Sequence, residues 1–112
     1  MKKLLVIVDV NSNNSALILE AMRFCAGIAI ADIQLNIYLT ENSLQTISEN
    51  SDNYEFIQQL DSSIDTLKKT YCSFFTPKKS NTAFLNIGEQ TDKIDIKELA
   101  EVSLQCDYLI RF

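Results

Sequence analysis

Histidine and tryptophan are absent from this 112-residue chain, and glycine and proline are rare, with two residues and one residue respectively. Without histidine there can be no Ser–His or Cys–His catalytic pair, and the commonest zinc ligand is also missing. The dinucleotide-binding fingerprint and the P-loop each need several glycines at fixed spacing, which Gly27 and Gly88 cannot provide. The scarcity of turn residues also disfavours a sandwich built from many short strands.

An excess of basic residues is missing as well. Ten lysines and arginines stand against fifteen aspartates and glutamates, which gives a net charge of −5. That balance offers little electrostatic support for binding nucleic acid. No stretch reaches the roughly 20 apolar residues that span a bilayer, and the apolar run after Met1 ends too early for a signal peptide. We therefore expect a cytoplasmic protein with reduced thiols that binds neither nucleic acid nor membrane.

What the chain does contain is a regular alternation of two hydrophobic patterns. Its length fits one domain, which we place over residues 1–112. Short apolar runs rich in valine and isoleucine predict strands, whereas apolar residues spaced by three or four predict helices. Strands are expected at 4–10, 33–40, 69–74, 82–87 and 108–112, and helices at 16–31, 41–51, 54–65 and 95–105.

The order of these segments predicts an α/β fold. Strands that alternate with helices are joined by right-handed crossovers, which produce a mainly parallel sheet covered on both faces. We therefore expect a three-layer α/β/α sandwich with about five strands. The segment 33–40 alternates apolar and polar residues, which indicates a strand nearer an edge of the sheet. The helix at 16–31 is apolar over more than one side, which indicates burial against a partner chain as well as the sheet.

Cys72 is the first candidate for chemistry. The predicted strand 69–74 places it near a carboxyl end, where open α/β sheets form their ligand sites. Four lysines lie within seven residues of it, namely Lys68, Lys69, Lys78 and Lys79. Ammonium groups nearby favour the thiolate, which is the nucleophilic form of cysteine. The alternative is a small apolar residue packed into the core, which is a common role for free cysteine.

The other candidates are assigned structural roles. Cys25 lies within the apolar helix, and Cys106 stands beside Asp107, whose carboxylate disfavours a thiolate. The three cysteines match no zinc spacing and form no Cys-x-x-Cys pair, so we expect no metal and no cofactor. Asp9 ends the first strand and is expected to serve the start of the next helix, where residues 11–15 supply capping groups.

Several parts of the chain, taken together, are similar to one known family. They are the apolar start at 1–8, the Ser/Asn turn, the helix from Ala16, the segment 33–43 and the span 54–72, which fits without a gap. The chain closes on Cys106-Asp107-Tyr108-Leu109-Ile110-Arg111-Phe112. In these features it resembles the DsrE/DsrF-like family, which includes the TusB, TusC and TusD subunits of the bacterial sulfur relay. The ending is most similar to TusC/DsrF-type subunits, which close on a Tyr-Asp-aliphatic-aliphatic-Arg-Phe pattern.

This resemblance implies a compact α/β sandwich that assembles into dimers, trimers or hexamers and acts near cytosolic sulfur transfer. In TusD- and DsrE-type subunits, one cysteine that follows a central strand accepts sulfur as a persulfide, and Cys72 matches that position. Lys69, Lys78 and Lys79 are then the supporting cations. TusC- and DsrF-type subunits are regarded as supporting members of the assembly.

Two interpretations remain open, and with them the question of whether the protein is an enzyme. In the first, Cys72 carries sulfane sulfur as a persulfide and passes it to a sulfur-carrier protein by thiol exchange, as a sulfurtransferase does. This predicts an accessible thiol with a lowered pKa. In the second, the chain is a non-catalytic interaction subunit of a homo- or hetero-oligomer of DsrE-like subunits. This predicts a buried Cys72 and a large hydrophobic interface that includes residues 108–112.

Overall fold

The computed structural model describes residues 1–11, 13–80 and 91–112, which form five strands and four helices. The strands are β1 (Lys2–Val8), β2 (Ile33–Leu39), β3 (Cys72–Pro77), β4 (Thr91–Ile94) and β5 (Tyr108–Arg111). The helices are α1 (Ser15–Ile28), α2 (Glu41–Glu49), α3 (Tyr54–Lys68) and α4 (Ile96–Gln105). Eight of these elements lie within a few residues of their predicted positions. The strand expected at 82–87 falls outside the described residues.

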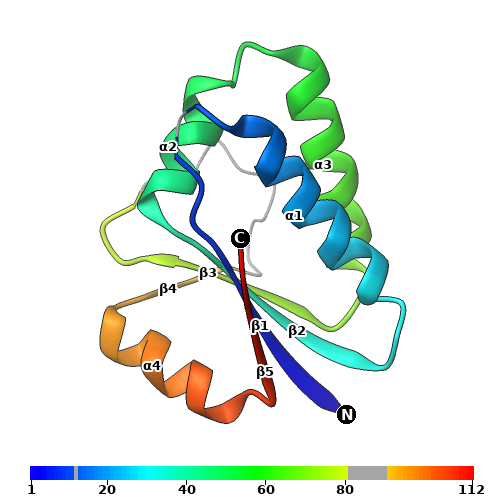
Figure 1. Ribbon diagram of the computed structural model, residues 1–112, viewed down its shortest axis with the longest axis vertical. Coiled ribbons are helices and arrows are strands. Elements are labelled where there is room, and N and C mark those ends of the chain that lie inside the picture. Colours follow the sequence, from blue (N-terminus) through cyan, green and yellow to red (C-terminus); the bar gives the residue numbers. More distant parts are fainter. Residues whose placement is uncertain (12, 81–90) are drawn as a thin grey trace.

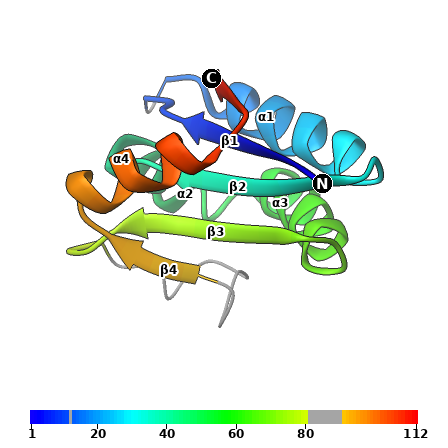
Figure 2. The ribbon, with the colours of Figure 1, turned by 90° about the horizontal axis from the view of Figure 1, so that it is seen from below.

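The five strands are all parallel, in the order β4-β3-β2-β1-β5. Helices α1, α2 and α3 cover one face of the sheet and α4 covers the other, which gives three layers (Figure 1). Seen from below, β1 and β5 lie on the same side of the molecule as α1, and β4 lies on the far side (Figure 2). The three-layer α/β/α sandwich with a parallel five-stranded sheet is therefore confirmed.

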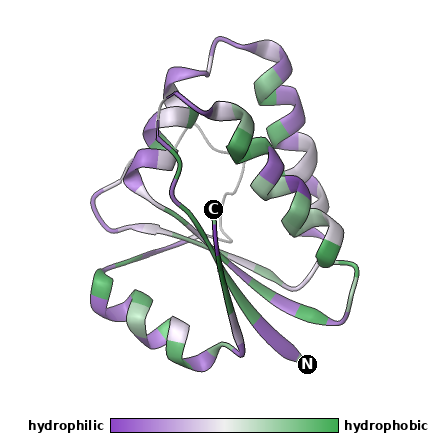
Figure 3. Ribbon diagram, in the orientation of Figure 1, coloured by the Kyte–Doolittle hydropathy of each residue, from purple (hydrophilic) through white to green (hydrophobic). Residues whose placement is uncertain are grey.

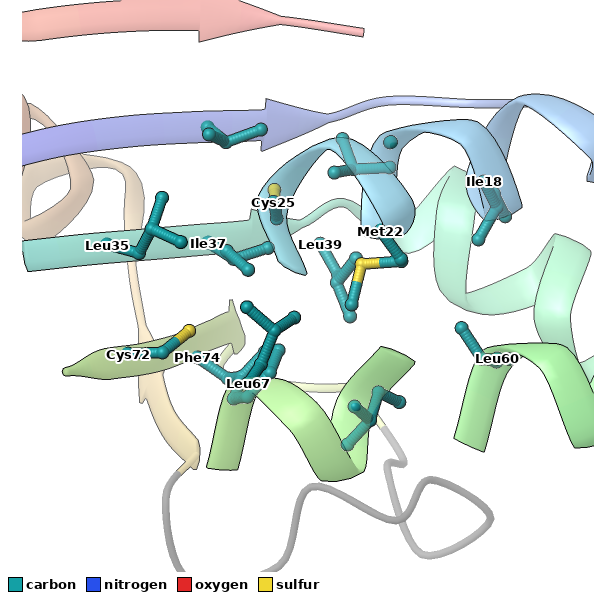
Figure 4. Packing of buried hydrophobic residues seen from close by; sticks show 14 of the residues in the cluster. Ile18, Met22, Cys25, Leu35, Ile37, Leu39, Leu60, Leu67, Cys72 and Phe74 are labelled. Carbon is teal, nitrogen blue, oxygen red and sulfur yellow. The ribbon is translucent and has the colours of Figure 1, made fainter. Parts of the chain in front are cut away.

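Two hydrophobic clusters hold the layers together. The larger lies between the sheet and α1–α3, and Figure 4 shows Met22 of α1 beside Leu39 and Leu67 of α3 beside Phe74. The smaller lies under α4 and combines buried residues of β1, β2 and β4 with partly buried residues of α4. Figure 3 shows hydrophilic and hydrophobic residues alternating along the helices, as expected for helices that bury one side only.

Strand β2 lies at the centre of the sheet, so the prediction that it is near an edge is wrong. The side that looks polar in the sequence carries Asn36 and Tyr38, which are only 7% and 5% exposed. The buried side chain of Asn36 has hydrogen-bond partners inside the protein. Its Nδ2 donates to the carbonyl of Leu4 over 3.5 Å and to Cys106 Sγ over 3.7 Å. The period of two identified the strand correctly, but a polar side chain does not show whether another layer covers it.

Strand β3 begins three residues later than predicted and ends at Pro77. Helix α3 continues to Lys68, and in the turn that follows the amide of Cys72 donates to the carbonyl of Thr70 over 2.9 Å. The β-branched and aromatic residues that favoured an earlier start belong partly to this turn. Cys72 is therefore the first residue of the strand, at the amino edge of the sheet, and its predicted place near the carboxyl end is wrong.

The helix ends agree with the sequence to different degrees. Helix α4 begins at Ile96, one residue after its predicted start, because Asp95 is its N-cap and forms a reciprocal capping box with Glu98. Helix α1 follows Asn14, whose side chain makes no capping hydrogen bond, and ends at Ile28, three residues earlier than predicted. A capping side chain therefore fixes the start of α4, whereas α1 is held by packing.

Strand β4 is a short edge strand that the sequence does not reveal. Its residues include the exposed Asp92 and Lys93, which leave no apolar run, and Ile94 is the only one of its four residues that is buried. Residues 91–94 form a strand because they pair with β3, in a parallel register that runs from Phe74 opposite Thr91 to Pro77 opposite Ile94. Such pairing depends on tertiary structure and leaves no periodic signal in a four-residue segment.

Candidate functional site

Cys72 lies inside the molecule. Its side chain belongs to the larger hydrophobic cluster and is only 8% exposed. In the sheet it pairs with Leu35 of β2, and Phe74 follows it on the same side of β3. Figure 4 shows Cys72 at the beginning of β3, in line with Leu35 and next to Phe74. The thiol therefore takes the place of a small apolar core residue.

Burial also controls the ionisation of this thiol. The loss of water contact, together with the smaller effect of nearby Cys25, raises the pKa of Cys72 to about 12. At pH 7 a thiol with a pKa so far above neutrality is almost entirely protonated. Because the thiolate is the form that attacks sulfur, a buried neutral thiol reacts slowly. The lowered pKa that a persulfide carrier requires is not found at Cys72.

The lysines that surround Cys72 in the sequence are separated in the structure. Lys69 caps the end of α3, near the beginning of β3, whereas Lys78 and Lys79 follow the end of that strand. Six residues of strand extend over roughly 20 Å, so the two groups of cations lie at opposite edges of the sheet. The structure therefore does not gather Lys69, Lys78 and Lys79 around one thiol.

Lys78 interacts with the beginning of α4. Its Nζ lies 3.0 Å from Glu98 Oε1 and 3.6 Å from Asp95 Oδ2. The hydrogen bond with Glu98 and the charges of both carboxylates raise the pKa of Lys78. The two acids are also the capping-box residues of α4, so Lys78 connects the end of β3 to that helix.

The other two cysteines lie where the sequence analysis expected packing residues. Cys25 of α1 is fully buried, and burial raises its pKa to about 12. Cys106 joins α4 to β5 at the amino edge of the sheet and is partly buried. Burial raises the pKa of Cys106, although Lys3 and the hydrogen bond from Asn36 act in the opposite direction. None of the three thiols reaches the carboxyl edge of the sheet.

The carboxyl edge instead carries a polar network around Asp9. Thr40 Oγ1 donates to Asp9 Oδ1 over 2.8 Å, and Asn42 Nδ2 donates to the same oxygen over 3.3 Å. Arg111, at the end of β5, donates from Nη2 to Asp9 Oδ2 over 2.7 Å. The hydrogen bond from Thr40, followed by those from Asn42 and Arg111, lowers the pKa of Asp9. Asp9 thus joins the ends of β1, β2 and β5, whereas the sequence predicted that it serves the start of α1.

A groove of about 470 Å³ opens beside this network. Its apolar wall comes from Ile7, Pro77 and Leu99, and its polar wall includes Asp9 and Arg111. No cysteine lines it. The groove lies where parallel sheets commonly bind ligands, yet it offers no thiol on which a persulfide could form.

Sequence reasoning missed the Asp9–Arg111 pair, because the two residues are 102 positions apart and meet only when the first and last strands pair. One signal was present in the sequence. Thr40 and Asn42 follow β2 as Asp9 follows β1, and the carboxyl ends of parallel strands meet at one edge of a sheet.

Residues 1–11, 13–80 and 91–112 contain neither a metal-binding cluster nor a helix that could span a membrane. In these ranges no group of three or more histidine, cysteine, aspartate or glutamate side chains is arranged to hold a metal ion. Among the helices of the same ranges, none combines the length and the apolar character needed to cross a lipid bilayer.

Comparison with known proteins identifies the fold. No family model matches the chain, and no curated protein matches it. Among solved structures, the chain is similar to the ychN protein from E. coli, with a TM-score of 0.69 and 15% sequence identity over 100% of both chains. This likeness covers every layer of the sandwich, and at such low identity it concerns the fold alone.

Proposed function

We propose that this protein is a non-catalytic interaction subunit of a cytoplasmic DsrE-like assembly, with residues 1–112 forming its domain. One observation carries the proposal: the chain has three cysteines, and none lies at the carboxyl edge of the sheet. Cys72, the thiol best placed by sequence, is a buried core residue. Without a reactive thiol at that edge, the domain serves as a surface through which the chain associates with other subunits.

Two other features support this proposal. The segment 106–112 resembles the ending of TusC/DsrF-type subunits, which are supporting members of sulfur-relay assemblies. The fold shared with the E. coli ychN protein is compatible with the same family. Neither feature requires a reactive cysteine in this chain.

Association needs an apolar surface, and α4 and β5 provide one. Four large side chains on these elements are between 58% and 85% exposed, namely Ile96, Leu104, Tyr108 and Leu109. We call them the α4–β5 surface. Tyr108 and Leu109 are successive residues of β5, so their side chains lie on opposite faces of the sheet, and both are available to a chain that covers this edge. Strand β5 also lies at an edge of the sheet, where a strand can pair with another chain.

Persulfide transfer on Cys72 is the second candidate, and the position of the adjacent residue favours it. Tyr71 is 72% exposed, so one residue separates the thiol from the surface, and Lys69 lies at the same end of β3. This function requires the turn between α3 and β3 to open, so that solvent reaches the thiol and its pKa falls.

Sulfur loading distinguishes the two candidates. Wild type, Cys72→Ser and the control Cys106→Ser are treated briefly with polysulfide, folded and in urea, and their intact masses are recorded. We expect Cys72 to gain one sulfur, about 32 Da, only in urea. A gain in the folded wild type that is lost in Cys72→Ser and kept in Cys106→Ser would replace this proposal with the persulfide carrier.

A further inference from the structure

Helix α1 carries a narrow exposed stripe that the fold does not use. Its residues, spaced by four, three and four positions, are Ala16, Glu20, Arg23 and Gly27, all of them exposed. At 100° per residue these positions fall within about 60° around the helix axis. The opposite side of the helix is buried through Ile18, Ala21, Met22 and Cys25. We call the four exposed residues the α1 stripe.

The α1 stripe is complementary to itself. A small residue stands at each end, and Glu20 and Arg23 stand between them. The Ala16/Gly27 pair and the Glu20/Arg23 pair have the same midpoint along the helix, between Ala21 and Met22. If a second copy of α1 runs antiparallel across a two-fold axis at that point, Glu20 of each copy faces Arg23 of the other, and Ala16 faces Gly27. An isologous interface requires this kind of self-complementary patch.

Within the described part of the chain, the two charged side chains of the stripe have no oppositely charged partner. Neither Glu20 nor Arg23 forms an ion pair there. Arg23 makes one hydrogen bond to its own helix, from Nε to the carbonyl of Leu19 over 3.3 Å. The two-fold arrangement supplies two equivalent ion pairs, and complementary charges of this kind fix the register of an interface.

Gly27 gives an independent reason to expect close contact. It lies within α1, where glycine weakens a helix relative to alanine. Nothing inside the chain requires its small size, because a Cβ built at this position meets no atom within 4 Å. The distance between two packed helices depends on the size of the side chains at the contact. A glycine opposite Ala16 of a second copy would let the helices approach closely.

The surroundings of the stripe leave it accessible and add an apolar contact. Figure 2 shows α1 on the outer side of the sheet, next to β1 and β5 and away from β4. Phe24 borders the stripe, is 38% exposed, and contacts Phe112 in a tilted arrangement, with ring centroids 5.5 Å apart and ring planes at 57°. This aromatic pair would add apolar contact area beside the charged residues of the stripe.

We propose that the α1 stripe is the contact surface of a homodimer, in which two copies pack α1 against α1 in antiparallel orientation across a two-fold axis. This rests on the proposed function, since it names the partner of an interaction subunit: a second copy of the chain. The four side chains that define the α4–β5 surface are uncharged, and this surface stays open to other subunits in such a dimer.

Charge reversal tests the pairing directly. Sedimentation equilibrium is measured for wild type, Glu20→Arg, Arg23→Glu and the double variant. Each single reversal places like charges opposite one another and is expected to weaken the dimer at least about tenfold. The double reversal restores opposite charges and the assembly of the wild type. An equimolar mixture of the two single variants is expected to form heterodimers, because each supplies the charge that the other lacks.

Two further variants separate the interface from folding. Lys97→Glu and Glu101→Arg reverse exposed charges on α4, and we expect both to assemble like wild type. A Cβ at position 27 meets no atom within 4 Å, and leucine favours a helix over glycine, so Gly27→Leu should unfold at no lower a temperature than wild type at low concentration, while its dimer is weakened at least about tenfold.

Two results would overturn the homodimer. They are a wild type that stays monomeric at high concentration, and single reversals that assemble as well as wild type. Both leave the interaction subunit standing, with its contacts on another surface. Sulfur loading of folded Cys72 would instead remove the proposed function, whatever the state of assembly, so the two failures are distinguishable.

Discussion

The two ends of β3 differ in chemistry and in access. At the amino end, Cys72 has a thiol, but the core encloses it and keeps it neutral. At the carboxyl end, Lys78 and Lys79 are exposed and charged, but no thiol accompanies them. A persulfide carrier needs an ionisable thiol and access at one place. In this chain the thiol and the exposed, charged surface lie at opposite ends of one strand, and this separation is the physical reason to assign the chain a role in association.

The strongest test moves a thiol to the accessible end. In a Cys106→Ser background, Lys79→Cys is expected to react with iodoacetamide at least about 1000-fold faster than Cys72, because an exposed thiol has a pKa near 8.5. Peptide mapping by mass spectrometry over time gives both rates in one sample. Equal rates at the two positions would mean that the ends of β3 do not differ in access.

A charge placed at each end tests the difference in burial. Cys72→Asp is expected to lower the free energy of unfolding by at least about 3 kcal/mol, because the core offers the carboxylate no partner. Lys79→Asp, at the exposed end, should unfold at the same urea concentration as wild type. Should Cys72→Asp fail to fold, Cys72→Ala should still fold, with a loss of about 1 kcal/mol. A Cys72→Asp variant as stable as wild type would contradict the buried position.

The polar network at the carboxyl edge has its own pH dependence. The pKa of Asp9 is lowered in the folded protein. Asp9 therefore contributes to the free energy of unfolding above the unfolded pKa of about 4, and this contribution is lost as the pH falls through the folded pKa. Asp9→Asn should therefore be less stable than wild type by about 1 kcal/mol at pH 7. The difference should shrink below about pH 4. Urea unfolding at several pH values measures it, and a constant difference would argue against the ionised network.

The smallest effect is expected at Lys78. Its ion pairs with Glu98 and Asp95 are exposed to solvent and screened by salt. Lys78→Ala should therefore keep the urea midpoint of wild type at physiological ionic strength, and its folded Cys72 should stay as unreactive as in wild type. A large change in the reactivity of Cys72 would instead connect Lys78 to the thiol.

Most of the fold could be predicted because its elements leave periodic patterns. The apolar start of the chain predicted β1, and the alternation at 33–39 predicted β2. The position of β2 in the sheet could not be predicted, since Asn36 and Tyr38 are polar residues that α4 and the residues around it cover. Strand β4 could not be predicted either, because pairing with β3 creates it.

The candidate site was harder to predict, because it depended on the end of one strand. A shift of three residues in β3 moved Cys72 from the carboxyl edge of the sheet to the amino edge. Boundaries of this kind are the weakest part of sequence-based prediction. The lysines around Cys72 were near in sequence, but a strand separates near neighbours by 3.3 Å per residue, so Lys69 and Lys78 face different partners.

The most direct measurement is alkylation of the three cysteines in the folded wild type at pH 8, followed residue by residue with mass spectrometry. We predict that the partly buried Cys106 is modified first, and that Cys25 and Cys72 react only as fast as the protein unfolds. Modification of Cys72 ahead of Cys106 in the folded protein would contradict the buried thiol on which the account depends.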